Sequence, residues 1–220
     1  TKVNSIKECI DEISKKSKEN NSFVYSWNMA ENLKFLGKGF VFQNKINVNN
    51  SENFKFLPEE ESSKIKPFLS IWNKLTIKAA NLIFYYLNST SKNFKEDDFT
   101  SVIFPFYGKE AYFNFFGKKG FYESQLLISE NKIEDFFDEF KFIFKKFQPS
   151  ISLLSFKNMR GTQEFLRFED NKMCITFDYI NNKKNSLFMS EIDKICVKLK
   201  ILPSIIKDSR LNKQIVEQCY

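Results

Sequence analysis

Two kinds of hydrophobic period alternate in the first part of the chain. Isoleucines recur at helical spacing behind a Ser-x-x-Glu capping sequence, which predicts a helix over residues 5–19. Runs rich in β-branched and aromatic residues at 23–27 and 39–43 predict two strands. A further helical period covers residues 74–87. That helix carries Leu75, Ala79, Leu82, Ile83 and Tyr86 on one stripe.

The second half of the chain follows the order strand, helix, strand, strand, helix, strand. The segments are 120–128, 129–144, 151–157, 173–179, 186–199 and 203–206. This order is the split β-α-β arrangement, in which an antiparallel sheet carries both helices on one face. We therefore expect an α+β fold with a ferredoxin-like second half, and a second sheet face that is free to cover something. The expected buried residues of the last helix are Leu187, Ile192, Ile195, Cys196 and Leu199.

Length and composition indicate a globular protein. With 220 residues, of which 42% are apolar, the chain can bury a core as one domain, or as one domain with a small extension. No window has the roughly 18 uninterrupted apolar residues of a membrane span, and no basic-then-apolar leader is present. The chain begins at Thr1 and stops at Tyr220 inside an amphipathic pattern, so we expect a piece of a longer, cytoplasmic protein.

The cysteine and histidine content limits the chemistry. The four cysteines form no C-x-x-C pair and the chain has no histidine, so we expect free thiols and no metal site. Without histidine, the commonest general base is missing, and so is the usual partner of a nucleophilic serine or cysteine. Self-contained hydrolase chemistry is therefore not expected.

The net charge of +7 is compatible with binding to nucleic acid. However, the lysines are dispersed among Asn, Phe and Ile, a mixture that A/T-rich codon usage also produces. An RNA-recognition domain has the same element order, but its third strand carries base-stacking aromatic residues, whereas Met173–Tyr179 has Cys174 at one such place. A basic, non-catalytic binding module remains the alternative to an enzyme domain.

A short motif near the C-terminus is the most specific feature of the chain. Ile206-Lys207-Asp208-Ser209-Arg210 follows the last expected strand, where a turn at the end of a sheet can face a ligand. Together with residues 115–125, 155–157 and 173–177, it resembles the substrate-domain half of the decaprenylphosphoryl-β-D-ribose 2-oxidase family, one of the FAD-linked oxidases that include the sugar-1,4-lactone oxidases. Order and spacing fit across the whole chain.

This resemblance implies a substrate-binding cap domain over residues 1–202 and a return segment into a flavin domain over 203–220. It implies oxidation of a secondary alcohol of a furanose or sugar lactone by hydride transfer to FAD. The chain has only six glycines and no glycine-rich turn, so FAD would be held by the rest of the flavoprotein and this chain alone would be inactive. A polyprenyl-phosphate sugar substrate would bring the protein to a membrane surface.

The resemblance also assigns roles to individual residues. Lys207 would reach both the flavin ring and the sugar hydroxyl, where a cation stabilises the negative charge that develops on the ring. The alternative is an exposed lysine in a turn. Asp208 and Arg210 would fix this turn through a carboxylate–guanidinium pair.

Five further residues match substrate positions of the family: Glu123, Gln125, Lys157, Cys174 and Trp27. Glu123 and Gln125 would hydrogen-bond the sugar, Lys157 would lie near a substrate phosphate, and Cys174 would face the flavin. Their alternatives are a solvent-facing strand, a surface lysine and a small buried residue. For Trp27 the alternative is core packing.

The sequence departs from the family at some positions. Ser204 stands where the family often has an aromatic residue, Lys200-Ile201 replaces a glycine pair, and Thr176 stands where an acidic residue can occur. The resemblance therefore leaves the identity of the sugar open.

Overall fold

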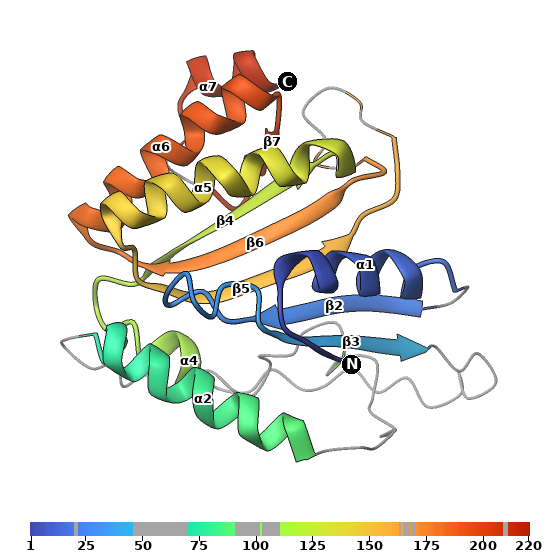
Figure 1. Ribbon diagram of the computed structural model, residues 1–220. Coiled ribbons are helices and arrows are strands. Elements are labelled where there is room, and N and C mark those ends of the chain that lie inside the picture. Colours follow the sequence, from blue (N-terminus) through green and yellow to red (C-terminus); the bar gives the residue numbers. More distant parts are fainter. Residues whose placement is uncertain are drawn as a thin grey trace, which may run out of the picture.

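The described residues form one antiparallel sheet of seven strands in the computed structural model (Figure 1). The structure describes residues 1–19, 22–45, 70–90, 102, 111–162, 164, 168, 170–208 and 211–220. The strands are β1 (Lys2–Val3), β2 (Ser22–Asn28), β3 (Gly39–Lys45), β4 (Phe121–Ile128), β5 (Ile151–Asn158), β6 (Met173–Ile180) and β7 (Leu202–Pro203). They lie in the order β1-β3-β2-β5-β6-β4-β7, and the expected α+β class is confirmed.

The second half has the predicted split β-α-β topology. The strands β7, β4, β6 and β5 lie side by side with antiparallel neighbours, and α5 (Ile133–Phe147) and α6 (Lys183–Leu199) connect them. The hairpin of β2 and β3 extends this sheet, because β2 also pairs antiparallel with β5. The N-terminal segment is therefore part of the same sheet.

One face of the sheet carries the main hydrophobic core. Side chains of α1 (Ile6–Lys16), α5 and α6 pack there against every second residue of the strands. Phe140 of α5 illustrates the packing, since its ring stacks on Phe177 of β6 at 5.5 Å and meets Phe188 of α6 edge-on. The phenylalanine stripe of the sequence thus faces the sheet, as its period predicted.

Helix ends follow local capping chemistry. The Ser5 hydroxyl accepts a hydrogen bond from the Glu8 backbone N–H at 3.1 Å, while the Glu8 carboxylate reaches back to the N–H of Asn4. A short 3-10 turn, Glu130–Lys132, precedes α5. Helix α6 begins earlier than the sequence predicted, because Asn182 caps it. One residue expected to be buried in this helix, Leu187, is 51% exposed, which corrects the prediction.

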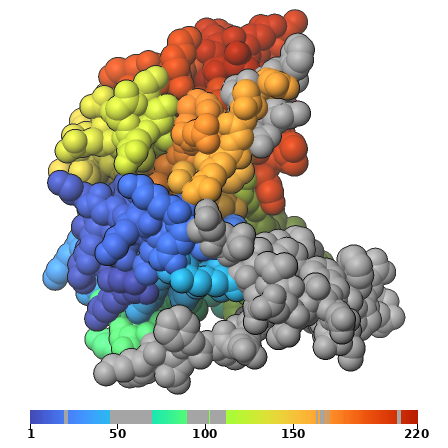
Figure 2. All heavy atoms as spheres, turned by 90° about the vertical axis from the view of Figure 1, so that its right-hand side faces the viewer, coloured from blue at the N-terminus to red at the C-terminus, as the bar shows by residue number. Residues whose placement is uncertain are grey.

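Helices α2 (Lys74–Thr90) and α4 (Ala111–Asn114) pack on the opposite face of the sheet (Figure 1). Tyr85 of α2 packs against Phe40 of β3, and Ile77 packs in a cluster with Ile180 of β6. Figure 2 shows α2 in green at the bottom and the C-terminal helices at the top. Helices α2 and α4 therefore cover part of this second face. We call the part around the middle of β4 and β6 the open face, as a name only, since Thr176 and Asp178 on it are buried.

Most of the stripe predicted for α2 is exposed, although Leu82 packs partly against the cluster of Phe40 and Tyr85. Leu75, Ile83 and Tyr86 are 80%, 60% and 69% exposed, whereas the helix buries Ile77 and Tyr85. The helix is apolar on more than one side, so its period alone did not determine which side meets the sheet. The contacts with β3 and β6 made that choice.

The C-terminal residues pack on the rest of the fold. The predicted boundary at residue 202 falls inside β7, which pairs with β4. Helix α7 (Lys213–Cys219) lies against α6, Cys219 belongs to the main core, and the Tyr220 hydroxyl donates a hydrogen bond to the Pro203 carbonyl at 2.8 Å. The described part of 203–220 is thus packed with the sheet in this structure.

Candidate functional site

A band of polar side chains crosses the open face between two apolar clusters. At one end, Phe121 and Ile180 pack beneath α2 and α4, and at the other end Leu127 and Leu202 pack around Cys174. Strand alternation places four polar residues between these clusters: Glu123, Gln125, Thr176 and Asp178. Polar groups in the middle of a sheet cost folding free energy unless they are paired, so this band is the strongest candidate for a binding site.

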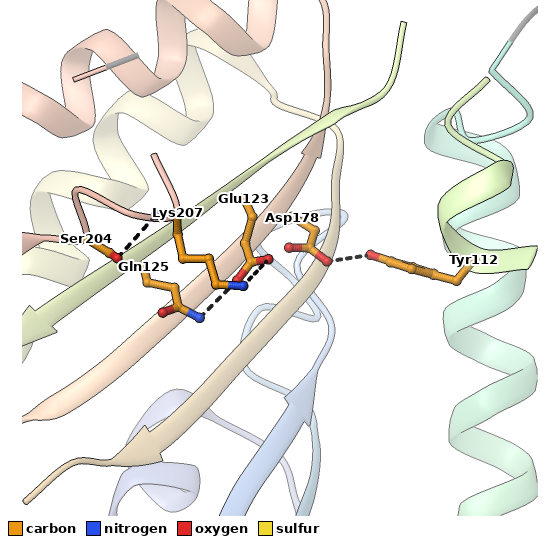
Figure 3. A network of polar contacts seen from close by, with 6 residues as sticks. All are labelled: Tyr112, Glu123, Gln125, Asp178, Ser204 and Lys207. Atoms are coloured by element: carbon orange, nitrogen blue, oxygen red, sulfur yellow. Dashed lines mark hydrogen bonds and ion pairs between the residues drawn. The ribbon is translucent and has the colours of Figure 1, made fainter. Parts of the chain in front are cut away.

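Lys207 reaches the open face from the turn after β7. Its Nζ lies 3.5 Å from Glu123 Oε2, and its side chain is 48% exposed (Figure 3). Ser204 holds the turn, because its hydroxyl accepts from the Lys207 N–H and its carbonyl accepts from the Asp208 N–H. The Gln125 amide donates to Glu123 Oε1 at 2.9 Å. Three predicted site residues, Lys207, Glu123 and Gln125, are therefore brought together.

Asp208 fixes the same turn from the other face of the sheet. It is buried, and its Oδ2 accepts a hydrogen bond from the Ser124 hydroxyl at 2.5 Å. Ser124 in turn lies 3.4 Å from the hydroxyl of Tyr179, a residue of the main core. The predicted partner Arg210 lies outside the described residues. Among the described residues, Asp208 is thus held by the hydroxyl of Ser124 on β4.

Asp178 and Tyr112 complete the band, and the sequence analysis assigned neither of them. Asp178 is 3% exposed, and its Oδ2 accepts a hydrogen bond from the Tyr112 hydroxyl at 2.9 Å. The Tyr112 hydroxyl also lies 2.8 Å from the Ser152 hydroxyl. Figure 3 shows Tyr112 reaching from α4 to Asp178, which lies between Tyr112 and Glu123.

Burial raises the pKa of both Asp178 and Tyr112. Burial raises the pKa of Asp178 to about 7, and the nearby charge of Glu123 adds to the increase; the Tyr112 hydrogen bond and the charge of Lys207 oppose it. Burial also raises the pKa of Tyr112 well above its usual range, so its phenol remains a hydrogen-bond donor. Asp178 is therefore a carboxyl group that changes its charge near neutral pH.

Two buried oxygens of β6 have hydrogen-bonding capacity left over. Among the described residues, Asp178 Oδ1 and Thr176 Oγ1 have no hydrogen-bond partner, apart from a contact of Thr176 with the Cys174 thiol. Buried polar atoms are normally paired, and an exception in a native fold calls for an explanation. Both side chains belong to the open face of the sheet.

Lys157 and Cys174 are cross-strand neighbours on β5 and β6, on the same face as Glu123. Cys174 is 1% exposed, and burial raises the pKa of its thiol to about 11, an increase that the charge of Lys157 opposes. The thiol is therefore protonated at neutral pH and packs with Leu127 and Leu202. This packing fits the alternative interpretation of Cys174 as a small buried residue.

Trp27 does not join the polar band. It stands on β2, which β5 and β6 separate from β4. Its ring lies 4.3 Å from the ring of Phe84 on α2 and 6.5 Å from that of Phe40. These contacts correspond to the core-packing alternative.

The sequence contains a signal for Asp178 but none for Tyr112. A charged residue within the apolar strand Met173–Ile180 marks Asp178 as a group that needs a partner. No comparable signal marks Tyr112, because its position depends on how α4 packs against the sheet.

The part of the chain that the structure describes contains neither a metal site nor a helix that could span a membrane. Within the ranges that the structure describes, no group of three or more His, Cys, Asp or Glu side chains is arranged to hold a metal ion. None of the helices described above is both long enough and apolar enough to cross a bilayer.

Comparison with known proteins does not assign the chain to a family. No protein-family model matches the sequence, and no curated protein matches it.

Proposed function

We propose that the chain is the substrate-binding cap domain of an FAD-dependent oxidoreductase that oxidises a secondary alcohol of a furanose or sugar lactone. The observation that carries this proposal is the meeting of Lys207, Glu123 and Gln125 on the open face. A cation, a carboxylate and an amide within one polar band suit a polyhydroxylated ligand.

The residues of the open face fit one side of a flavin site. The Lys207 ammonium is half-exposed, so it remains available to a neighbouring group. A fixed cation stabilises the negative charge that forms at the N1/C2 carbonyl edge of a reduced flavin. No glycine-rich, phosphate-binding turn is evident in the sequence, so the nucleotide part of FAD would be held elsewhere in the flavoprotein.

Different side chains of the open face would bind different groups of the substrate. Glu123 and Gln125 accept from and donate to the sugar hydroxyls, and Lys157, at the end of β5, provides a point charge for a phosphate. When bound, the flavin accepts a hydride from the carbinol carbon. Lys207 orients the reacting hydroxyl and supplies positive charge.

The alternative, a basic nucleic-acid-binding module, is less compatible with the open face. Glu123 and Asp178 lie in the middle of this face, where carboxylates repel phosphate and make a poor platform for stacked bases. That module would bind an oligonucleotide with an affinity that falls steeply with salt.

The deciding experiment is to read the open reading frame around this segment and to express the whole protein. We expect a glycine-rich flavin domain upstream of Thr1 and a yellow, FAD-containing product. In that protein Lys207→Ala should slow flavin reduction about 100-fold and weaken sugar binding much less. Lys213→Ala removes an exposed lysine of α7 and serves as the matched control. A colourless protein without a nucleotide-binding half would rule out the proposal.

A further inference from the structure

Two carboxylates face each other in the middle of the open face. Glu123 of β4 and Asp178 of β6 are direct partners in the antiparallel register, so their side chains project from the same face. Figure 3 shows the Asp178 carboxyl with one oxygen toward Tyr112 and the other on the Glu123 side. Like charges in direct opposition destabilise a sheet, which makes this pair unexpected on structural grounds alone.

The two members of the pair have different surroundings. Both Glu123 oxygens are engaged, one by the Gln125 amide and the other by Lys207, and its side chain is 23% exposed. Asp178 is buried, bonds to Tyr112 through one oxygen, and has no partner for the other among the described residues. The two carboxyl groups therefore differ in burial and in partners, and Asp178 is the more buried of the two.

We propose that Glu123 and Asp178 act as one proton-sharing pair, which takes up the proton that the substrate hydroxyl releases during oxidation. This inference depends on the proposed oxidase function. Glu123 is the catalytic residue, because it is the member that a ligand on the open face can touch. Asp178 is a positioning residue that stores the proton behind it.

The carbinol carbon loses its hydrogen as hydride to the flavin, so the sugar is oxidised and the flavin is reduced. The hydroxyl O–H bond breaks, its electron pair forms the carbonyl, and its proton passes to Glu123 and on to Asp178. Four described groups face Asp178: Glu123 of β4, Lys207 of the turn after β7, Tyr112 of α4 and Ser152 of β5.

The pair can be tested on this chain alone, without flavin or sugar. We would follow the carboxyl carbons by NMR during a pH titration of the wild type, Glu123→Gln and Lys207→Met, with Asp138→Asn on the exposed side of α5 as the control. Glu123→Gln should move the Asp178 midpoint down by about one pH unit, and Lys207→Met should move it up. Because the shifts have opposite signs, general loosening of the fold does not reproduce both. An Asp178 midpoint that neither variant moves would overturn the pair.

The role in oxidation is tested in the whole flavoprotein with a methyl ribofuranoside phosphate and a sugar lactone as probes. Asp178→Asn should flatten the rise of the flavin-reduction rate through neutral pH, while sugar binding stays within about threefold of the wild type. An unchanged pH profile overturns this inference and leaves the oxidase proposal standing. A wild-type protein that reduces no flavin with any sugar overturns the oxidase proposal, and the proton-uptake role with it.

Discussion

Lys207 and Asp208 are consecutive residues whose side chains lie on opposite faces of the sheet. The Lys207 ammonium contacts Glu123 on the open face. The Asp208 carboxylate accepts a hydrogen bond from Ser124 on the face that carries the main hydrophobic core. Glu123 and Ser124 are themselves consecutive on β4, so the turn contacts this strand on both faces of the sheet. We call these two contacts the clasp. The buried clasp positions the exposed lysine.

The two halves of this clasp should contribute differently to stability. Asp208→Ala removes the short hydrogen bond from the buried Ser124 hydroxyl and should lower the free energy of unfolding by about 1–3 kcal/mol. Lys207→Ala removes a half-exposed ion pair and should cost less than about 1 kcal/mol. Urea unfolding of both variants measures the difference. Equal losses would show that the turn does not depend on Asp208.

Asp178 should make stability depend on pH. Its raised pKa means that the folded chain binds this proton more tightly than the unfolded chain does. The resulting stabilisation is present in full below about pH 4 and is lost as pH rises through about 7. Asp178→Asn keeps an acceptor for Tyr112 but cannot ionise, so its stability relative to the wild type should rise by on the order of 2 kcal/mol between about pH 5 and pH 8.

Chemical denaturation of both proteins at several pH values checks this prediction. Asp138→Asn, at an exposed position on α5, provides a control that should run parallel to the wild type. Parallel curves for Asp178→Asn would mean that the pKa of Asp178 is the same in the folded and the unfolded chain.

Helix α2 offers a matched pair of apolar substitutions. Ile77 is buried beneath the helix, so Ile77→Ala leaves a cavity and should cost about 2–4 kcal/mol. Leu75, two residues earlier, is 80% exposed, and Leu75→Ala should change stability by less than about 0.5 kcal/mol. Thermal or urea unfolding distinguishes them, and the reverse ranking would restore the stripe that the sequence predicted.

The four thiols should resist labelling in the folded chain. All four cysteines are free and buried, and burial raises the pKa of Cys9 and Cys174 to about 11. Cys219 is the most exposed of them at 8%, so it should react first. Mass spectrometry after treatment with a thiol reagent, with and without denaturant, gives the order. Rapid labelling of Cys174 in the native chain would show that this thiol is open to ligands.

Several features could be predicted from the sequence because they depend on local order. Alternation along β4 places Glu123 and Gln125 on one face, and the phenylalanine period of α5 determines which side of that helix is buried. The element order of the second half was enough to predict its topology, since connections of this kind leave few alternatives. The position of Lys207 after the last strand followed from the same order.

Other features depend on contacts between segments that are distant in the sequence. The register of β4 against β6 set Asp178 opposite Glu123, and the packing of α4 brought Tyr112 to Asp178. For the same reason the period of α2 did not predict its buried side, which the contacts with Phe40 and Ile180 determine.

The order of residues was thus enough to predict the class of fold and the faces on which most candidate residues lie. Three features appear only in the folded chain: Trp27 packs under α2, Cys174 is a buried thiol, and a second carboxylate joins the polar band. Hydrophobic period is a property of consecutive residues, whereas burial and pKa depend on which distant side chains meet.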